Sequence, residues 1–148
     1  MSSLSYELHK LTARLDRAAD RLLREHEDMS YSRFLALFAV GEGVDSQRAL
    51  SEWLGQSEPS TSRMTGVLSD SGLLEVTRVA GAGNRRHLEL TEEGADLVKR
   101  ASRLLEKRFA ELVDRSGVSY SSYERNTRRL LSQLGADQDA MARRGRVA

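Results

Sequence analysis

The sequence predicts a mainly α-helical protein that carries one small β-hairpin. Two long stretches repeat apolar residues at helical spacing, and two short helical segments between them are separated by a tight turn. After the second short segment, two stretches of alternating apolar and polar residues flank a glycine-rich turn, which predicts the hairpin.

The composition is that of a helix-rich domain. The chain has 148 residues, of which 39% are hydrophobic and 30% are charged, with a single proline. We expect one domain over residues 1–148 in a homodimer, because an extended helical chain of this size often completes its core with a partner. We also expect a cytoplasmic protein without membrane contact, because no apolar run approaches the roughly 20 residues that span a bilayer and no secretory signal is recognised. A chain without cysteine has no disulfide, thiolate metal site or cysteine redox switch.

The first long helix, at about residues 4–27, is predicted by one apolar stripe. The residues of this stripe recur at steps of three and four, as Leu4, Leu8, Leu11, Leu15, Ala18 and Leu22. A stripe of this length needs a partner surface.

Ser30 can cap a second helix that carries Phe34 on its apolar side and ends near Gly41.

A pair of short helices separated by a tight turn follows. Ser46 can cap the first helix and Gly55 can end it, with an inward side expected to hold Ala49, Leu50, Trp53 and Leu54. Ser57 can cap the second helix, where Pro59 is tolerated because first-turn amides have no intrahelical partner. The residues expected on its buried side are Thr61, Met64 and Leu68, and those expected to face outward or sideways are Ser60, Ser62, Arg63, Gly66 and Val67.

The hairpin is predicted around a turn at residues 81–84. Leu74 and Val76 alternate with polar residues before this turn, and Leu88 and Leu90 do so after it. Three arginines lie on the hairpin, at Arg78, Arg85 and Arg86.

Two further helices complete the predicted fold. Thr91 can cap a long helix that reaches about Asp114, with a stripe of Leu97, Ala101, Leu104, Leu105, Phe109 and Leu112. Gly117 separates it from a last helix that is capped near Ser119 and carries Tyr123, Thr127, Leu130, Leu131 and Leu134 on one face. Residues 141–148 are expected to form a basic tail.

The order of these elements resembles the multiple antibiotic resistance regulator (MarR) family over nearly the whole chain. Residues 46–55 (SQRALSEWLG) resemble the first helix of the family's helix-turn-helix, and residues 57–64 (SEPSTSRM) resemble the start of its recognition helix. Residues 90–94 (LTEEG) resemble the motif that joins the wing to the long dimerisation helix. The sequence departs from the family pattern at Asn84, where an acidic residue usually precedes the wing arginine.

The resemblance implies a winged helix-turn-helix at about residues 30–90, with dimerisation helices at about residues 4–27 and 92–135. It also implies a sequence-specific transcriptional regulator, most simply a repressor, that binds double-stranded DNA at a palindromic operator as a homodimer. A small-molecule effector that enters between the dimerisation helices and the DNA-binding region would release the operator. An activator would share the same chemistry.

The expected DNA contacts begin on the recognition helix. Arg63 lies within two turns of its start, where a guanidinium can reach O6 and N7 of a guanine in the major groove. The alternative is a solvated or ion-paired arginine. Ser60 and Ser62 can contact bases or phosphates, whereas Ser57 is chiefly a helix cap.

The wing supplies the second set of expected contacts. Arg85, which is nearer the turn, is expected to enter the minor groove with Arg86 beside it, and Arg78 is expected on the strand surface. The alternative is an arginine pair that only solvates the turn. Residues 46–90 hold five basic and five acidic side chains, and this balance favours a second hypothesis, an interaction or scaffold module that no longer binds DNA.

Four residues are candidates for an effector pocket on the first two helices, namely His9, Arg14, Tyr31 and Phe34. Each has an equally good interpretation as a packing or surface residue, and core packing is favoured for Phe34 and for Trp53. The histidines lie in different elements without the spacing of a zinc site. No nucleophile with a base, paired carboxylates or phosphate loop is recognised, so we expect neither an enzyme nor a cofactor.

Overall fold

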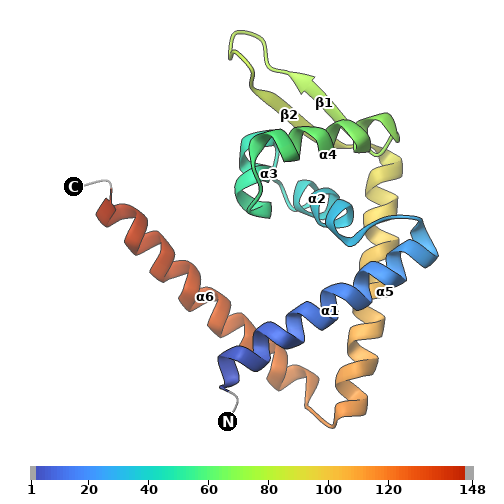
Figure 1. Cartoon of the computed structure of the whole chain (residues 1–148), viewed down its shortest axis with the longest axis vertical. Helices are drawn as coiled ribbons and strands as arrows, with labels where there is room; N and C mark the ends of the chain where they lie inside the picture. Colours follow the sequence, from blue (N-terminus) through green and yellow to red (C-terminus); the bar gives the residue numbers. More distant parts are fainter. Residues whose placement is uncertain (1–2, 146–148) are drawn as a thin grey trace. The chain divides into compact units, whose positions relative to one another are not determined.

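The computed structural model describes residues 3–145 and has the fold class that the sequence predicts. Its elements are α1 (Leu4–Glu27), α2 (Tyr31–Gly41), α3 (Gln47–Leu54), α4 (Glu58–Asp70), β1 (Leu74–Arg78), β2 (Arg86–Leu90), α5 (Glu92–Ser116) and α6 (Tyr120–Gly145), labelled in Figure 1. The chain forms two compact units that meet within α5, the first ending at Leu105 and the second beginning at Glu106.

The predicted helix caps are confirmed. The side chains that accept a first-turn backbone N–H are Ser30, Ser46, Ser57 and Thr91. Gly55 ends α3 with a φ of 65°, a left-handed conformation that suits a residue without a side chain. These local signals place the boundaries of the two short helices within one residue of the prediction.

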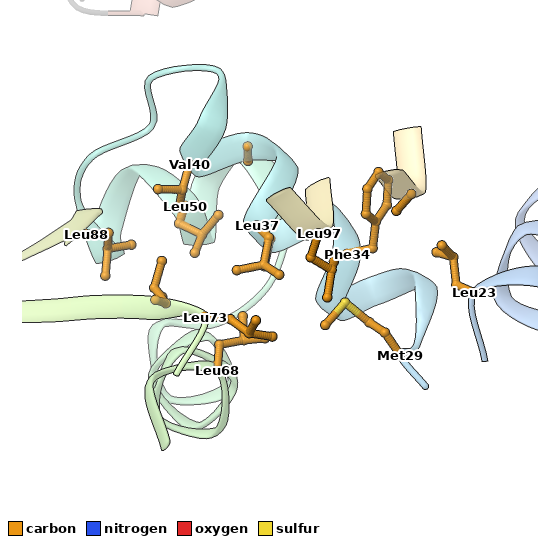
Figure 2. Packing of buried hydrophobic residues seen from close by; sticks show 14 residues of the cluster. Leu23, Met29, Phe34, Leu37, Val40, Leu50, Leu68, Leu73, Leu88 and Leu97 are labelled. Atoms are coloured by element: carbon orange, nitrogen blue, oxygen red, sulfur yellow. The ribbon is translucent and has the colours of Figure 1, made fainter. Parts of the chain in front are cut away.

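The core of the first unit is built around α2. This helix buries Phe34, Ala36, Leu37, Ala39 and Val40. The other elements each contribute at least one buried side chain, including Leu23, Leu50, Leu68, Leu88 and Leu97 (Figure 2). Because one cluster joins α1–α4, the hairpin and the start of α5, the two short helices and the hairpin are supported by the same core.

The hairpin is an antiparallel pair whose register runs from Leu74 opposite Leu90 to Arg78 opposite Arg86. The strands project beyond α3 and α4 as an arm (Figure 1). The Leu88 N–H donates a 2.8 Å hydrogen bond to the Asp45 carbonyl oxygen, just before α3. The base of the arm is therefore attached to the start of the helix-turn-helix.

The hairpin also joins α5 through a close backbone contact. The Thr91 hydroxyl donates to the Gly72 carbonyl oxygen at 2.7 Å and accepts the Gly94 N–H at 3.0 Å. A Cβ at Gly94 would overlap the Leu73 carbonyl oxygen and lie 3.0 Å from the Leu73 carbonyl carbon. Glycine is therefore required at this point of the predicted Leu-Thr-Glu-Glu-Gly motif.

Two expectations about these elements are wrong, and one is incomplete. Trp53 is 47% exposed rather than packed inward, because it lies on a side of the short helix α3 that the core does not cover. On α4, the half-buried Met64 packs against the core as expected, but the buried side also includes Thr65, which was not expected there. The last helix extends to Gly145, so residues 141–145 are helical and not a tail, because neither a proline nor a competing contact stops α6 after Leu134. Residues 146–148 lie outside the described part.

Both units expose apolar stripes. In the first unit, α1 buries only Leu23, and Leu4, Leu8 and Leu11 are exposed. In the second unit, α6 buries none of its described residues, and Leu130, Leu131 and Leu134 are each more than half exposed.

Candidate nucleic-acid interface

Helix α4 has one buried side and one exposed polar side. Thr61, Thr65 and Leu68 are almost fully buried at the spacing of one helix face. Arg63 lies two residues from both threonines and is exposed, together with Ser62. Arg63 is thus presented on the side of α4 opposite the core, and Ser62 is exposed at the flank of the helix.

The start of α4 holds Arg63 in a defined orientation. The Ser57 hydroxyl accepts the Ser60 N–H at 3.3 Å, and the Ser60 hydroxyl accepts a hydrogen bond from Nη2 of Arg63 at 3.1 Å. Ser60 is half-buried, and its hydroxyl stabilises the Arg63 guanidinium through this hydrogen bond. The structure therefore brings together three of the predicted residues, and Ser62 lies next to them in sequence and is exposed.

A polar link between α3 and α4 was not predicted. The side-chain amide of Gln47 donates a 2.8 Å hydrogen bond to the Thr65 hydroxyl, which donates in turn to the Ser62 carbonyl oxygen at 3.1 Å. The sequence contains no signal for this link, because a glutamine in a first turn and a threonine on a buried side are each common alone.

The wing arginines differ in exposure. Arg85 is exposed at the end of the turn, where its carbonyl oxygen accepts the Val79 N–H, and Arg86 is half-buried at the start of β2. Arg78 is exposed on β1 opposite Arg86. Arg85 is thus nearer the tip of the hairpin than Arg86 and more exposed, and its contact with DNA stays a prediction.

A groove of about 740 Å³ lies between the wing, the start of α3 and the first turn of α4. Its basic lining residues are Arg48, Arg85, Arg86 and, when protonated, His87, and its acidic ones are Asp45, Glu52 and Glu58. Nε of Arg48 lies 3.5 Å from Oε1 of Glu52, and both side chains are exposed. The balance of charge seen in the sequence of this segment thus recurs within the groove, and the carboxylates in it were not singled out from the sequence.

The candidate effector residues are spread over α1 and α2. His9 and Arg14 are exposed on α1, whereas Phe34 is 4% exposed in the core. Tyr31 is half-buried and stacks on Phe34 with ring centroids 6.2 Å apart. Burial raises the pKa of the Tyr31 hydroxyl, with a further contribution from the charge of Asp16. None of these candidates lines the groove beside the wing, and the effector pocket stays a prediction.

Within residues 3–145, no group of three or more histidine, aspartate and glutamate side chains is arranged to hold a metal ion. In the same range, no helix has both the length and the apolar character that crossing a membrane requires.

Comparison with known proteins identifies the fold. No model of a known protein family matches the sequence, and no curated protein matches it. Many solved structures match the fold, and they include MarR-family proteins and other transcription regulators. The resemblance to the MarR family is thereby confirmed at the level of the fold, a winged helix with flanking long helices.

Three of these structures illustrate the match. A MarR family protein from Bacillus stearothermophilus is 18% identical with a TM-score of 0.76, covering 89% of this chain and 93% of its own. The Staphylococcus aureus MepR–DNA complex is 21% identical with a TM-score of 0.71, covering 92% and 99%. The Mycobacterium tuberculosis transcriptional regulator MOSR, solved in complex with DNA, is 23% identical with a TM-score of 0.67, covering 94% and 98%.

Proposed function

We propose that this protein is a sequence-specific DNA-binding transcriptional regulator and not an enzyme. The observation that carries the proposal is the exposed face of α4, where Ser60 supports the Arg63 guanidinium and Ser62 lies beside it. A helix with small polar residues and one arginine on its exposed side fits the major groove. Two proteins with the same fold, MepR and MOSR, were solved with DNA, which adds independent support.

In this proposal the recognition helix discriminates bases and the wing anchors the complex. Arg63 donates two hydrogen bonds to O6 and N7 of a guanine, Ser60 and Ser62 contact the adjacent backbone or base edges, and Ser57 caps the helix beside them. Arg85 enters the neighbouring minor groove, and Arg86, half-buried at the start of β2 beside the turn, contacts phosphate.

The regulator acts as a homodimer on a palindromic operator. The exposed leucines of α1 and α6 support this step, because apolar stripes of that length gain stability when a second copy covers them. Two recognition helices related by a two-fold axis then contact two half-sites. We propose that the protein lies in the cytoplasm and that it represses transcription when it is bound to the operator.

A small-molecule effector is the proposed release signal. Tyr31 and Phe34 would form the apolar wall of its site, and His9 and Arg14 would supply polar contacts from α1. The effector weakens DNA binding only to the extent that it prefers a spacing of the recognition helices that does not fit the operator.

Binding to a labelled duplex of random sequence at low salt tests the proposal most simply. We expect measurable binding that weakens steeply as salt is added, because a DNA-binding protein releases counterions from phosphates. The balanced charge of the groove favours the alternative hypothesis of a protein-interaction module. Such a module would show no DNA binding at any salt concentration.

A further inference from the structure

One hydrogen-bond chain crosses from α3 to the recognition helix. Gln47 Nε2 in the first turn of α3 donates to Thr65 Oγ1 at 2.8 Å, and the Thr65 hydroxyl donates to the carbonyl oxygen of Ser62 at 3.1 Å. Thr65 is only 1% exposed, so its side chain cannot touch DNA. The chain therefore ends on the backbone one residue before Arg63 without taking part in the DNA-binding surface.

The remaining contact between these helices is different in kind. Leu50 of α3 and Leu68 of α4 are fully buried in the shared core. The hydrophobic effect is itself non-directional, and close packing of these side chains limits rotation of one helix against the other only to within its packing tolerance. A hydrogen bond has a preferred angle and distance. Among residues 3–145, the Gln47–Thr65 bond is the one side-chain hydrogen bond between α3 and α4.

We infer that Gln47 and Thr65 are positioning residues that set the rotation of α4 about its own axis and thereby the sharpness of operator discrimination. This inference rests on the proposed DNA-binding function. Side-chain atoms lie about 6 Å from a helix axis, so a rotation of about 10° displaces them by about 1 Å. Bidentate hydrogen bonds to a guanine do not tolerate such a displacement, whereas contacts with the flexible phosphate backbone do.

The same face of α4 provides a matched control. Thr61 lies one turn before Thr65 and is fully buried, but its hydroxyl donates to the Ser57 carbonyl oxygen at 3.0 Å, within its own helix segment. Thr61→Val and Thr65→Val therefore remove the same group from the same buried face. Only Thr65→Val breaks the link to α3.

The experiment compares the parent protein with Thr65→Val, Thr61→Val and the conservative variant Thr65→Ser. The probes are a duplex selected by the parent from a random-sequence library and a scrambled duplex of equal composition. Fluorescence anisotropy at two salt concentrations gives the ratio of the two affinities and the salt slope, and circular dichroism melting reports folding. Gln47→Leu removes the donor of the same hydrogen bond at a half-exposed position. It is measured in parallel in case Thr65→Val does not fold.

We expect Thr65→Val and Gln47→Leu to lower the ratio of the two affinities about tenfold. This is only part of the discrimination that two bidentate base contacts supply, because the contacts are displaced and not removed. The affinity for scrambled DNA and the salt slope should stay close to the parent values, and Thr61→Val and Thr65→Ser should keep the ratio. An unchanged ratio in Thr65→Val, an equal loss in Thr61→Val, or a loss on both duplexes alike would overturn the inference. A parent protein that binds neither duplex would instead refute the proposed function itself.

Discussion

Replacing Gly94 by alanine should destabilise the protein substantially. The new Cβ would overlap the Leu73 carbonyl oxygen and lie 3.0 Å from the Leu73 carbonyl carbon, whereas carbon atoms pack well at about 3.5–4.0 Å. The obstacle is backbone and cannot rotate away, so α5 and the connection between α4 and β1 must separate. That separation also stretches the bonds of the Thr91 hydroxyl to Gly72 and Gly94.

The expected size follows from three contributions. Overpacking costs about 3 kcal/mol, the weakened Thr91 hydrogen bonds cost about 1 kcal/mol, and alanine regains about 1 kcal/mol of helix propensity. The free energy of unfolding should therefore fall by about 3 kcal/mol, which lowers the melting temperature by roughly 10 °C in a chain of this size.

Urea and thermal unfolding monitored by circular dichroism measure this change, with all proteins at the same protomer concentration because association contributes to stability. Gly66→Ala is the matched control, since its Cβ meets nothing within 4 Å on the exposed side of α4. It should raise stability by up to about 1 kcal/mol. If Gly94→Ala were as stable as the parent, the close contact with Leu73 would not exist in solution.

Three further predictions concern the wing, the dimer and α1. Arg85→Ala should weaken binding mainly to operators with A·T-rich flanks, as measured by anisotropy beside Arg78→Ala, and equal loss on every flank would mark a phosphate contact instead. Light scattering should give a dimer at micromolar concentration, and a folded monomer would contradict the proposed assembly. Asp20 accepts hydrogen bonds from the Arg24 side chain and the Tyr31 N–H, which lower the pKa of its carboxyl group in that order. Its stabilising contribution should be complete above about pH 5 and disappear as the pH falls through the lowered pKa, so the stabilities of the parent and Asp20→Asn should converge in acid; a difference unchanged at about pH 2 would contradict this.

The elements of this fold were predictable because their signals are local. A cap such as Ser46 and a terminator such as Gly55 act within one helical turn, so the sequence alone contains the information. The same holds for the hairpin, whose alternating residues identify the buried face around Leu88. The two sides of α4 followed from periodicity, which placed Met64 correctly against the core but left out the buried Thr65.

The errors in the prediction lie at positions where tertiary contacts determine the exposure of a side chain or the end of a helix. Helix α3 has only eight residues, so its apolar side is poorly defined by periodicity and the exposure of Trp53 depends on what packs nearby. The length of α6 was underestimated, because Gly135 costs only about 1 kcal/mol in a helix interior and does not end the helix by itself. The Gln47–Thr65 bond depends on how two helices cross, and that geometry is set by the whole core.

The most direct test of the central claim is the ratio of affinities for a selected operator and a scrambled duplex, measured for the parent, Arg63→Ala and Arg33→Ala. Arg33 is an exposed arginine of α2 that does not line the groove beside the wing, and it serves as the control. If Arg63 bonds to guanine in both half-sites, its loss removes about 1–3 kcal/mol of discrimination in each, so the ratio should approach one while Arg33→Ala keeps the parent ratio. An unchanged ratio in a folded Arg63→Ala protein would contradict base recognition by α4, and a uniform loss on both duplexes with a smaller salt slope would assign Arg63 to phosphate instead.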